Sequence, residues 1–551
     1  MVAARRLGAV TAVTAVTEMT AATRPGSLAE SLADRIAADA ATGGPFGPDA
    51  TAARDEAERF PDDEVRLLDA WGGPAAFVPA RLGGAPGDVH DLFDVVRVLA
   101  EHDLTLAVGY CKTYLGAAPV WVAGGPEQQA QVARLVMVEH AVASWGLTEP
   151  GRGSDLAAGT TRARRRPDGA WVLDGTKWPV NNASRGRLLT VLARTADRPG
   201  PAGTSVLLVD GADIGPGGRT PLPKARTHGI RGADISGVRF SEAVLPAGAL
   251  VGQEGTGLRT TLLALQFTRM VTAALSVAAL TSAHRVVGEF AHARELHGTR
   301  LARLPHAARV LADAAAALDL VVSGCRTALG TSATRPAELS VVSALVKAGV
   351  PTLAQRHLTA LAQLYGARGY LAPGPVSDGR FARLERDHRI VAIFDGSTAV
   401  NRAGVVAQLP VVAARHAARH AAGPAAGGDL LDLLAAARDR RPADYGGATL
   451  LSRDGCTLLG VLTDPSAPGA AGVLAGALSA TLEAGRALRT VADRQEPAAV
   501  QLVARLELLY LAAAVELRRR AGELADDRAE RALSLAARQV QALPLDAEVA
   551  A

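Results

Sequence analysis

A glycine-rich loop, Leu147–Asp155, carries residues suited to holding a ligand. Thr148 supplies a hydroxyl where an apolar run ends, and Gly151 and Gly153 let the backbone turn sharply and approach a bound molecule closely. Ser154 adds a polar side chain that can cap the turn. Such a loop suits a planar cofactor with polar edges, although an ordinary glycine turn has a similar composition.

Two further segments add candidate chemistry. Gly252–Gly257 opens a helical stretch, and Arg386–Ile390 leads into Ile393-Phe394-Asp395-Gly396-Ser397, where a single acid follows apolar residues. With Leu147-Thr148-Glu149-Pro150-Gly151-Arg152-Gly153-Ser154-Asp155, these motifs occur in an order that resembles the acyl-CoA dehydrogenase superfamily over residues 60–415. The resemblance implies FAD as the cofactor and an acyl thioester as the substrate. The expected reaction removes an α-proton and passes the β-hydride to flavin N5.

Asp395 occupies the position at which the family places its catalytic carboxylate, which is usually a glutamate. Aspartate shortens the arm by about 1.5 Å, the length of one carbon–carbon bond. A misplacement of about 1 Å can cost a factor of roughly 100 in rate. The plainer interpretation of Asp395 is a charge that favours a helix N-terminus. Some relatives place the base before an arginine in the first bundle helix, but here that position is Thr268, which cannot act as a base.

The resemblance also assigns residues to the cofactor and the substrate. It places Leu147 and Thr148 at the flavin edge, with Gly153 and Ser154 at the ring and the substrate entrance. Arg269 matches an arginine near the thioester, for which a structural ion pair is the alternative. Further matches on the cofactor side are Asn181, Arg294, Gln363, Gly366 and Ser397. Departures from the family pattern are Pro179 and Asn181 in the strand motif, Ala367 and Arg368 beside Gly366, and Ala399.

Composition excludes several other classes of protein. The 59 basic and 55 acidic residues of this 551-residue chain are interspersed, and aromatic residues make up only 4%, which argues against a nucleic-acid-binding surface. The three cysteines are far apart and form no metal motif, so we expect a reducing, cytoplasmic setting. No metal is expected. We also expect no transmembrane segment, because no apolar run is expected to reach the length of a membrane span. Residues 1–26 are interpreted as a disordered leader.

Hydrophobic periodicity predicts helices over residues 89–102, 258–284 and 286–297 and an apolar run over 104–122. It also predicts the domain order. Residues 27–143 are expected to form a helical domain, 144–250 a β domain (a barrel or sandwich), and 251–420 a four-helix bundle. Within the β domain, Asp174-Gly175 is expected to form a hairpin turn. A linker at 421–428 then leads to an additional helical region, 429–551. The predicted fold is therefore mostly α with an inserted β domain, as in the family, plus a C-terminal helical extension.

The leading hypothesis is an FAD-dependent acyl-thioester dehydrogenase acting on acyl-CoA or an acyl carrier protein. The expected partners are an electron-transfer flavoprotein, or a similar acceptor, and a second copy of the chain in a homodimer or homotetramer. The alternative is an oxidase or monooxygenase of the same fold, because nitroalkane oxidases resemble this family and use aspartate at the base position. A flavin-binding structural partner without turnover is a third hypothesis.

Overall fold

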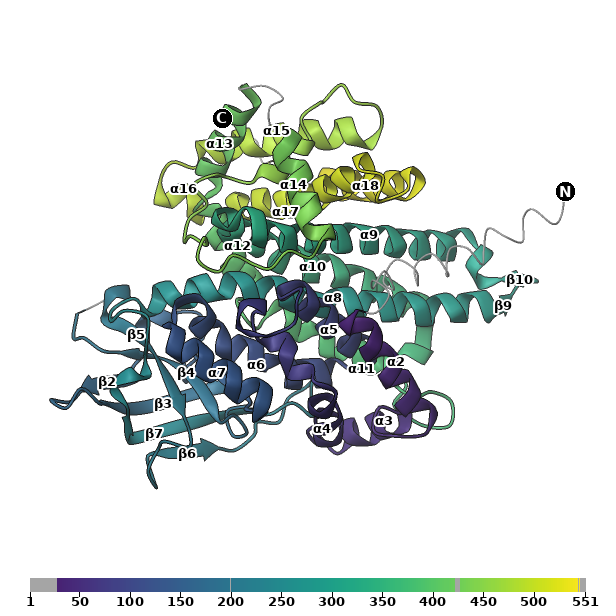
Figure 1. Ribbon diagram of the computed structural model, residues 1–551. Coiled ribbons are helices and arrows are strands. Elements are labelled where there is room, and N and C mark those ends of the chain that lie inside the picture. Colours follow the sequence, from purple (N-terminus) through teal and green to yellow (C-terminus); the bar gives the residue numbers. More distant parts are fainter. Residues whose placement is uncertain (1–26, 199, 422–426, 544, 546–551) are drawn as a thin grey trace.

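The computed structural model describes residues 27–198, 200–421, 427–543 and 545 (Figure 1). The predicted leader, and most of the predicted linker at 421–428, lie outside the described residues. Helices come first, a sheet follows, and long helices then continue to the C-terminal end of the described chain. This order confirms the predicted fold class.

The first helices surround one buried helix, α6. Asp103 caps its start by accepting a hydrogen bond from the Thr105 amide at 2.9 Å. The helix is apolar all round and is buried between its neighbours, as such a composition requires. The helices are α2 (Leu28–Ala41), α3 (Pro48–Glu56), α4 (Asp62–Trp71), α5 (Val89–His102), α6 (Leu104–Ala123) and α7 (Pro126–Val138).

The sheet has the order β6-β7-β3-β2-β4-β5-β8, and β1 adds to β4 in parallel. One face holds its own apolar core, which includes Leu173, Val191 and Phe240. The strands are β1 (Ala143–Gly146), β2 (Arg162–Arg165), β3 (Trp171–Asn181), β4 (Leu188–Arg194), β5 (Thr204–Asp210), β6 (Arg219–Leu222), β7 (Ile235–Leu245) and β8 (Leu250–Val251).

The predicted hairpin turn at Asp174-Gly175 is wrong. Both residues lie inside β3, where the pairing with β7 shifts register between Leu173 and Gly175. A side chain at Gly175 would come within 2.7 Å of Thr161, so the glycine serves a bulge and a close backbone approach. The turn that joins β2 to β3 lies directly before β3, at residues 166–170. There the Arg166 amide donates a hydrogen bond to the carbonyl of residue 170 at 2.8 Å.

The bundle is built on long helices. The sequence predicted two helices for residues 258–284 and 286–297, but they form one continuous helix, because no residue between them breaks the helical backbone. The helices are α8 (Gly257–Ala293), α9 (Pro305–Thr334), α10 (Leu339–Tyr365), α11 (Arg380–His388), α12 (Thr398–Val406) and α13 (Leu409–Ala421). The two-residue strands β9 (Glu295–Leu296) and β10 (Thr299–Arg300) form a small hairpin after α8.

Three helical segments among the described residues are long and apolar enough to cross a membrane by length and composition alone: Gly257–Ala293, Pro336–Tyr370 and Pro497–Arg520. The expectation that no such run exists is therefore wrong. The shares of their apolar windows buried inside the protein are 89%, 89% and 78%, so packing within the molecule accounts for the apolar composition.

The C-terminal region lies over α9 and α10, on the side of the bundle away from the sheet (Figure 1). Backbones approach closely there. A side chain added at Gly349 of α10 would meet Glu507 at 3.0 Å, and one at Gly330 of α9 would meet the Leu433 carbonyl at 2.5 Å. The helices are α14 (Gly427–Arg438), α15 (Ala470–Ala487), α16 (Val491–Gln495), α17 (Pro497–Arg520) and α18 (Asp526–Gln541).

The C-terminal region is also tied to the N-terminal helices. Tyr445 lies fully inside the protein, where its hydroxyl donates to Asp88 at 2.9 Å and lies 3.2 Å from the Tyr114 hydroxyl. Its ring packs against Phe267 of α8 at 4.5 Å between centroids. Residues 429–543 are thus part of the same packed body as the rest of the chain.

Candidate active site

Helix α6 organises the centre of the molecule because one of its faces contacts three other parts of the chain. Thr105, Gly109, Lys112 and Gly116 recur every three or four residues and therefore share a face. Thr105 donates a hydrogen bond to Asp387 (3.4 Å), and Lys112 forms an ion pair with Asp395. The carbonyl of Gly109 accepts from the Asn182 side-chain amide (2.7 Å), and the carbonyl of Gly116 accepts from the Thr190 hydroxyl (2.8 Å). The end of β3 and the Asp395 segment thereby meet on one helix.

Asp395 is held by an unusual backbone. Its φ is +54° and that of Gly396 is +90°, after which Ser397 caps α12 by accepting from the Val400 amide at 3.3 Å. A left-handed conformation is uncommon for a residue with a side chain and costs free energy. The conformation turns the Asp395 side chain toward α6, and only 16% of that side chain is exposed.

The Asp395 carboxylate forms an ion pair with the ammonium of Lys112, which is itself only 9% exposed. The same ammonium lies over the Phe394 ring, 3.8 Å from its centroid. Burial lowers the pKa of Lys112, and the neighbouring Asp395 opposes that shift. The predicted base is therefore not a free carboxylate but one member of a buried pair.

Two more cations face the same carboxylate. Arg269 is buried, and its Nε has no hydrogen-bond partner. Burial lowers the pKa of Arg269 to about 10, against the attraction of Asp395. Lys347 of α10 donates to the Val391 carbonyl at 2.5 Å and lies 5.4 Å from the Phe394 centroid. Burial lowers the pKa of Lys347 to about 7. Three cationic groups thus surround one carboxylate.

The predicted flavin-edge loop lies beside β3. The Trp178 amide donates to the Thr148 carbonyl at 2.9 Å, and Lys177 donates to the Leu147 carbonyl at 3.2 Å. Glu149 is buried and pairs with Lys177 at 2.8 Å. Burial acts to raise the pKa of Glu149. Lys177 and the backbone amides of residues 160 and 161 outweigh burial and lower this pKa to about 2. Glu149 therefore fixes the loop.

Residues beside this loop fit a polar-edged ring. Asn181 Oδ1 is buried without a hydrogen-bond partner, so its amide is available to a ligand. Trp178 is 37% exposed on the same strand and offers an apolar surface, while Gly153 and Ser154 are exposed at the loop tip. An unpaired amide, an exposed aromatic ring and a glycine loop together suit the isoalloxazine of FAD.

The structure separates the remaining cofactor residues from this centre. Arg294, Gln363 and Gly366 are exposed and lie together at the far end of α8 and α10, where Phe290 contacts Tyr365 at 5.1 Å. Arg294 follows Arg269 by 25 positions along α8, a distance of about 37 Å in a helix. The predicted residues thus divide into a buried group around Asp395 and an exposed group at the end of the bundle.

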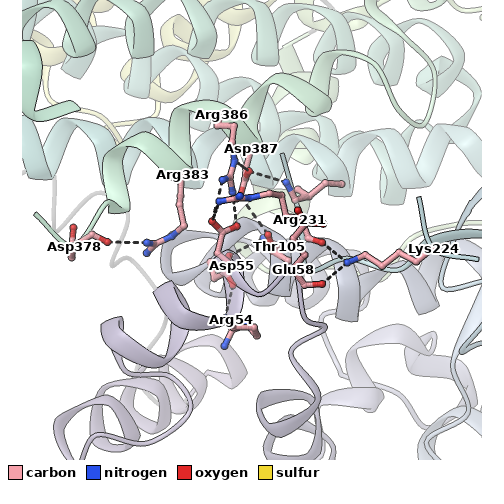
Figure 2. A network of polar contacts seen from close by, with 12 residues as sticks. Arg54, Asp55, Glu58, Thr105, Lys224, Arg231, Asp378, Arg383, Arg386 and Asp387 are labelled. Atoms are coloured by element: carbon pink, nitrogen blue, oxygen red, sulfur yellow. Dashed lines mark hydrogen bonds and ion pairs between the residues drawn. The ribbon is translucent and has the colours of Figure 1, made fainter. Parts of the chain in front are cut away.

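The Arg386–Ile390 motif contributes a structural network rather than a reactive group (Figure 2). Arg386 bonds Asp55 at 2.6 Å and Asp387 at 2.7 Å, while Asp387 accepts from the Ile230 amide at 2.8 Å. Arg231 also reaches Asp55 at 2.7 Å. The network joins α3, the loop between β6 and β7, and α11 (Figure 2).

Lys112 and Lys347 are not among the residues predicted from the sequence. Lys112 is the only charged residue within the apolar run 104–123, and Lys347 is the only one between residues 339 and 355. A lone lysine in a helix that is otherwise apolar all round cannot reach water, so it requires a partner inside the protein. This signal would have indicated both residues, but not their partner.

Comparison with known proteins finds two matching domains and several relatives. Residues 144–243 match the acyl-CoA dehydrogenase middle domain, and residues 255–409 match the acyl-CoA dehydrogenase C-terminal domain. Probable acyl-CoA dehydrogenase FadE25 of Mycobacterium tuberculosis is 28% identical over 348 residues, which cover 63% of this chain and 87% of that protein.

Solved structures agree on the fold. Butyryl-CoA dehydrogenase of Megasphaera elsdenii has a TM-score of 0.59 and 25% identity, and the match covers 64% of this chain and 90% of that chain. An acyl-CoA dehydrogenase of Bacillus anthracis, complexed with FAD, has a TM-score of 0.66 and 20% identity. That match covers 94% of this chain and 90% of that chain, so the shared fold extends over the C-terminal region as well. The chain therefore contains regions that match the middle and C-terminal domains of the acyl-CoA dehydrogenase family, and its relatives indicate an FAD-dependent oxidoreductase.

Proposed function

We propose that the protein dehydrogenates an acyl thioester at its α and β carbons, with Asp395 as the base. The observation that supports this most directly is the placement of Asp395. It is a mostly buried carboxylate in a strained backbone conformation, and it is held against α6 within the part of the chain that matches the family's C-terminal domain. When bound, FAD supplies the oxidant that accepts the hydride from the β carbon.

Each side chain of the site has its own role in the proposed reaction. Asp395 accepts the α-proton on a carboxylate oxygen, which requires Lys112 to move from that oxygen or to share it. Arg269, whose Nε is unpaired, donates toward the thioester oxygen as negative charge develops there. Thr148, Ser154 and Asn181 bind and orient the flavin edge and the substrate entrance.

Arg294, Gln363, Gly366 and Ser397 complete the cofactor site in this proposal. Arg294 lies about 37 Å from Arg269 along α8, and Gln363 and Gly366 lie at the end of α10. In this proposal the three residues serve the pyrophosphate and adenine of FAD held by a neighbouring copy of the chain. The proposed assembly is therefore a homodimer or a homotetramer. The proposed electron acceptor is an electron-transfer flavoprotein, and the proposed compartment is a reducing cytoplasm, where the buried thiols of Cys111, Cys325 and Cys456 stay unpaired.

The test is anaerobic mixing of the FAD-loaded protein with acyl-CoAs of graded chain length while the flavin absorbance is followed. Bleaching is expected, and Asp395→Asn should slow it by about 100- to 10,000-fold, the usual range for loss of a general base. Asp213→Asn, at an exposed loop position, is the matched control and should bleach at the wild-type rate.

A full rate in Asp395→Asn would contradict the assignment of the base. Air is then admitted to the bleached protein, which distinguishes a dehydrogenase from an oxidase. Slow return of the oxidised spectrum is expected for a dehydrogenase, whereas rapid return would show that oxygen is the acceptor.

A further inference from the structure

The buried charges around Asp395 do not balance. Lys112, Arg269 and Lys347 are all enclosed by protein, and Asp395 is the carboxylate that all three face. Among the residues that the structure describes, neither Arg269 nor Lys347 forms an ion pair with any carboxylate. Enclosed cations without counter-charges are costly, so this arrangement is retained at the expense of stability.

The same geometry weakens the proposed base. The ammonium of Lys112 is bound to Oδ2 of Asp395 and stabilises the charged carboxylate, so Asp395 takes a substrate proton less readily while this ion pair stands. Once Asp395 has taken that proton and become neutral, the cluster also loses its one protein carboxylate. A neutral acyl group would then leave Lys112 with only the Phe394 ring as a partner. Productive binding therefore needs a second anion near the Lys112 ammonium.

Resting on the proposed function, we propose that the acyl group of the substrate carries a carboxylate. This carboxylate takes the place of Asp395 beside Lys112, and the exchange releases Asp395 to act as the base. Lys112 is then a specificity-determining residue that recognises the anionic end of the acyl chain, and its ion pair with Asp395 keeps the base covered until such a substrate arrives.

The atoms of the reaction balance as in ordinary dehydrogenation. The α C–H bond breaks and its proton goes to Asp395, while the β C–H bond breaks and its hydride goes to oxidised FAD, leaving a carbon–carbon double bond. The distal carboxylate and the thioester are unchanged. The product is an α,β-unsaturated acyl thioester that still carries its acid.

The experiment compares carbon-matched probes on the FAD-loaded full chain without oxygen. The acidic probes are the glutaryl and adipyl thioesters of pantetheine, and their neutral counterparts are the pentanoyl and hexanoyl thioesters. Pantetheine is the part that CoA and acyl carrier proteins share, so the result does not depend on the carrier. At low probe concentration, the acidic probes should bleach the flavin at least about tenfold faster, as expected for one charge-assisted hydrogen bond.

Two variants at Lys112 test its role. Lys112→Met should remove the preference by slowing the acidic probes and speeding the neutral ones, while Lys112→Arg retains the charge and should retain the preference. A role of Lys112 in stabilising the thioester oxygen, or in structure alone, would slow both kinds of probe equally. If Lys112→Met does not fold, the wild-type preference and Lys112→Arg still decide the question.

Equal or faster bleaching by the neutral probes in the wild type would overturn this inference and leave the proposed dehydrogenase standing. An equal loss with both kinds of probe in Lys112→Met would overturn it as well. Failure of all four probes with a fully loaded wild type would instead contradict the proposed function, and with it the inference that rests on it.

Discussion

Two buried charge clusters lie eight positions apart in the sequence and differ in almost every physical respect. Around Asp387, the charges of Arg386, Arg231 and Asp55 are matched and joined by hydrogen bonds across three parts of the chain (Figure 2). Around Asp395, three cations surround one carboxylate and Arg269 Nε is unpaired. The charges of the first cluster satisfy one another, although Arg231 Nε also lacks a hydrogen-bond partner, whereas the charges of the second cluster do not.

The difference separates a structural role from a functional one. A network whose charges balance holds elements in place and needs no ligand to complete it. An unsatisfied buried cluster costs stability, and such costs persist where a bound molecule makes up what is missing. Perturbed titration alone would not distinguish the two, because burial shifts the pKa of Asp387 upward just as it shifts that of Lys347 downward.

The largest effect on stability is expected from breaking the satisfied cluster. Arg386→Met leaves Asp387 and Asp55 enclosed with too little counter-charge, so the free energy of unfolding should fall by about 3–5 kcal/mol. Urea unfolding of the flavin-loaded protein measures this change.

The matched control for that variant is Arg226→Gln, which removes an exposed arginine that pairs with Glu58 at the edge of the same region. It should leave the unfolding curve almost unchanged. An Arg386→Met protein as stable as the wild type would show that the network is dispensable and would remove the contrast between the two clusters.

In the cluster around Asp395, removal of a charged side chain is expected to raise the free energy of unfolding rather than lower it. Lys347→Met removes an enclosed cation with no ion-pair partner, so the free energy of unfolding should rise by about 1–4 kcal/mol at pH 7 while activity falls.

The gain in Lys347→Met should depend on pH. The folded protein holds the pKa of Lys347 at about 7, below the ordinary 10.5, so the unfolded chain binds more protons between these values and wild-type stability rises with pH. The advantage of the variant is therefore largest at or below pH 7 and shrinks by up to about 1.4 kcal/mol per unit as the pH approaches 10. Unfolding of both proteins at pH 7, 8 and 9.5 checks this, and a gap that widens with pH would contradict it.

The smallest effect is expected from Thr105→Val. This change removes the hydrogen bond of 3.4 Å from Thr105 to Asp387 but keeps the shape of the side chain and the amide that Asp103 caps. Because Asp387 keeps Arg386 and the Ile230 amide, the free energy of unfolding should fall by no more than about 1 kcal/mol, with the rate of flavin bleaching unaltered. A slower reaction at full stability would mean that the satisfied cluster also acts on the chemistry.

Local patterns predicted much of the fold. Helix α5 has the predicted bounds, and α6 differs from the predicted run by one residue, because strong periodicity and clear stop signals mark both. One error arose where tertiary packing overrides a local signal. Asp174-Gly175 has the composition of a turn but forms a bulge because β7 continues beside it. A second error was the break predicted near residue 285, which does not occur because no helix-breaking residue stands there.

The site was less predictable than the fold. The motif around Asp395 indicated the carboxylate, but its ion-pair partner Lys112 lies 283 positions away, and no spacing rule joins them. Likewise, Arg294 and Gln363 matched the family one by one, whereas the distance of Arg294 from Arg269 follows only from the length of α8. The roles of these residues remain predictions.

One contact in the C-terminal region affects how the protein is made. Helix α12 begins two residues after Gly396, and its Arg402 donates a forked pair of hydrogen bonds, at 2.7 and 2.8 Å, to the Glu507 carboxylate of α17. Glu507 is buried, and it leaves the ribosome 105 residues later than Arg402. Domains fold in order as they are synthesised, so the sheet and the early helices can assemble while the base still lacks its final support. The support that Glu507 gives to α12, directly after the Asp395 segment, is therefore added only once α17 has been translated.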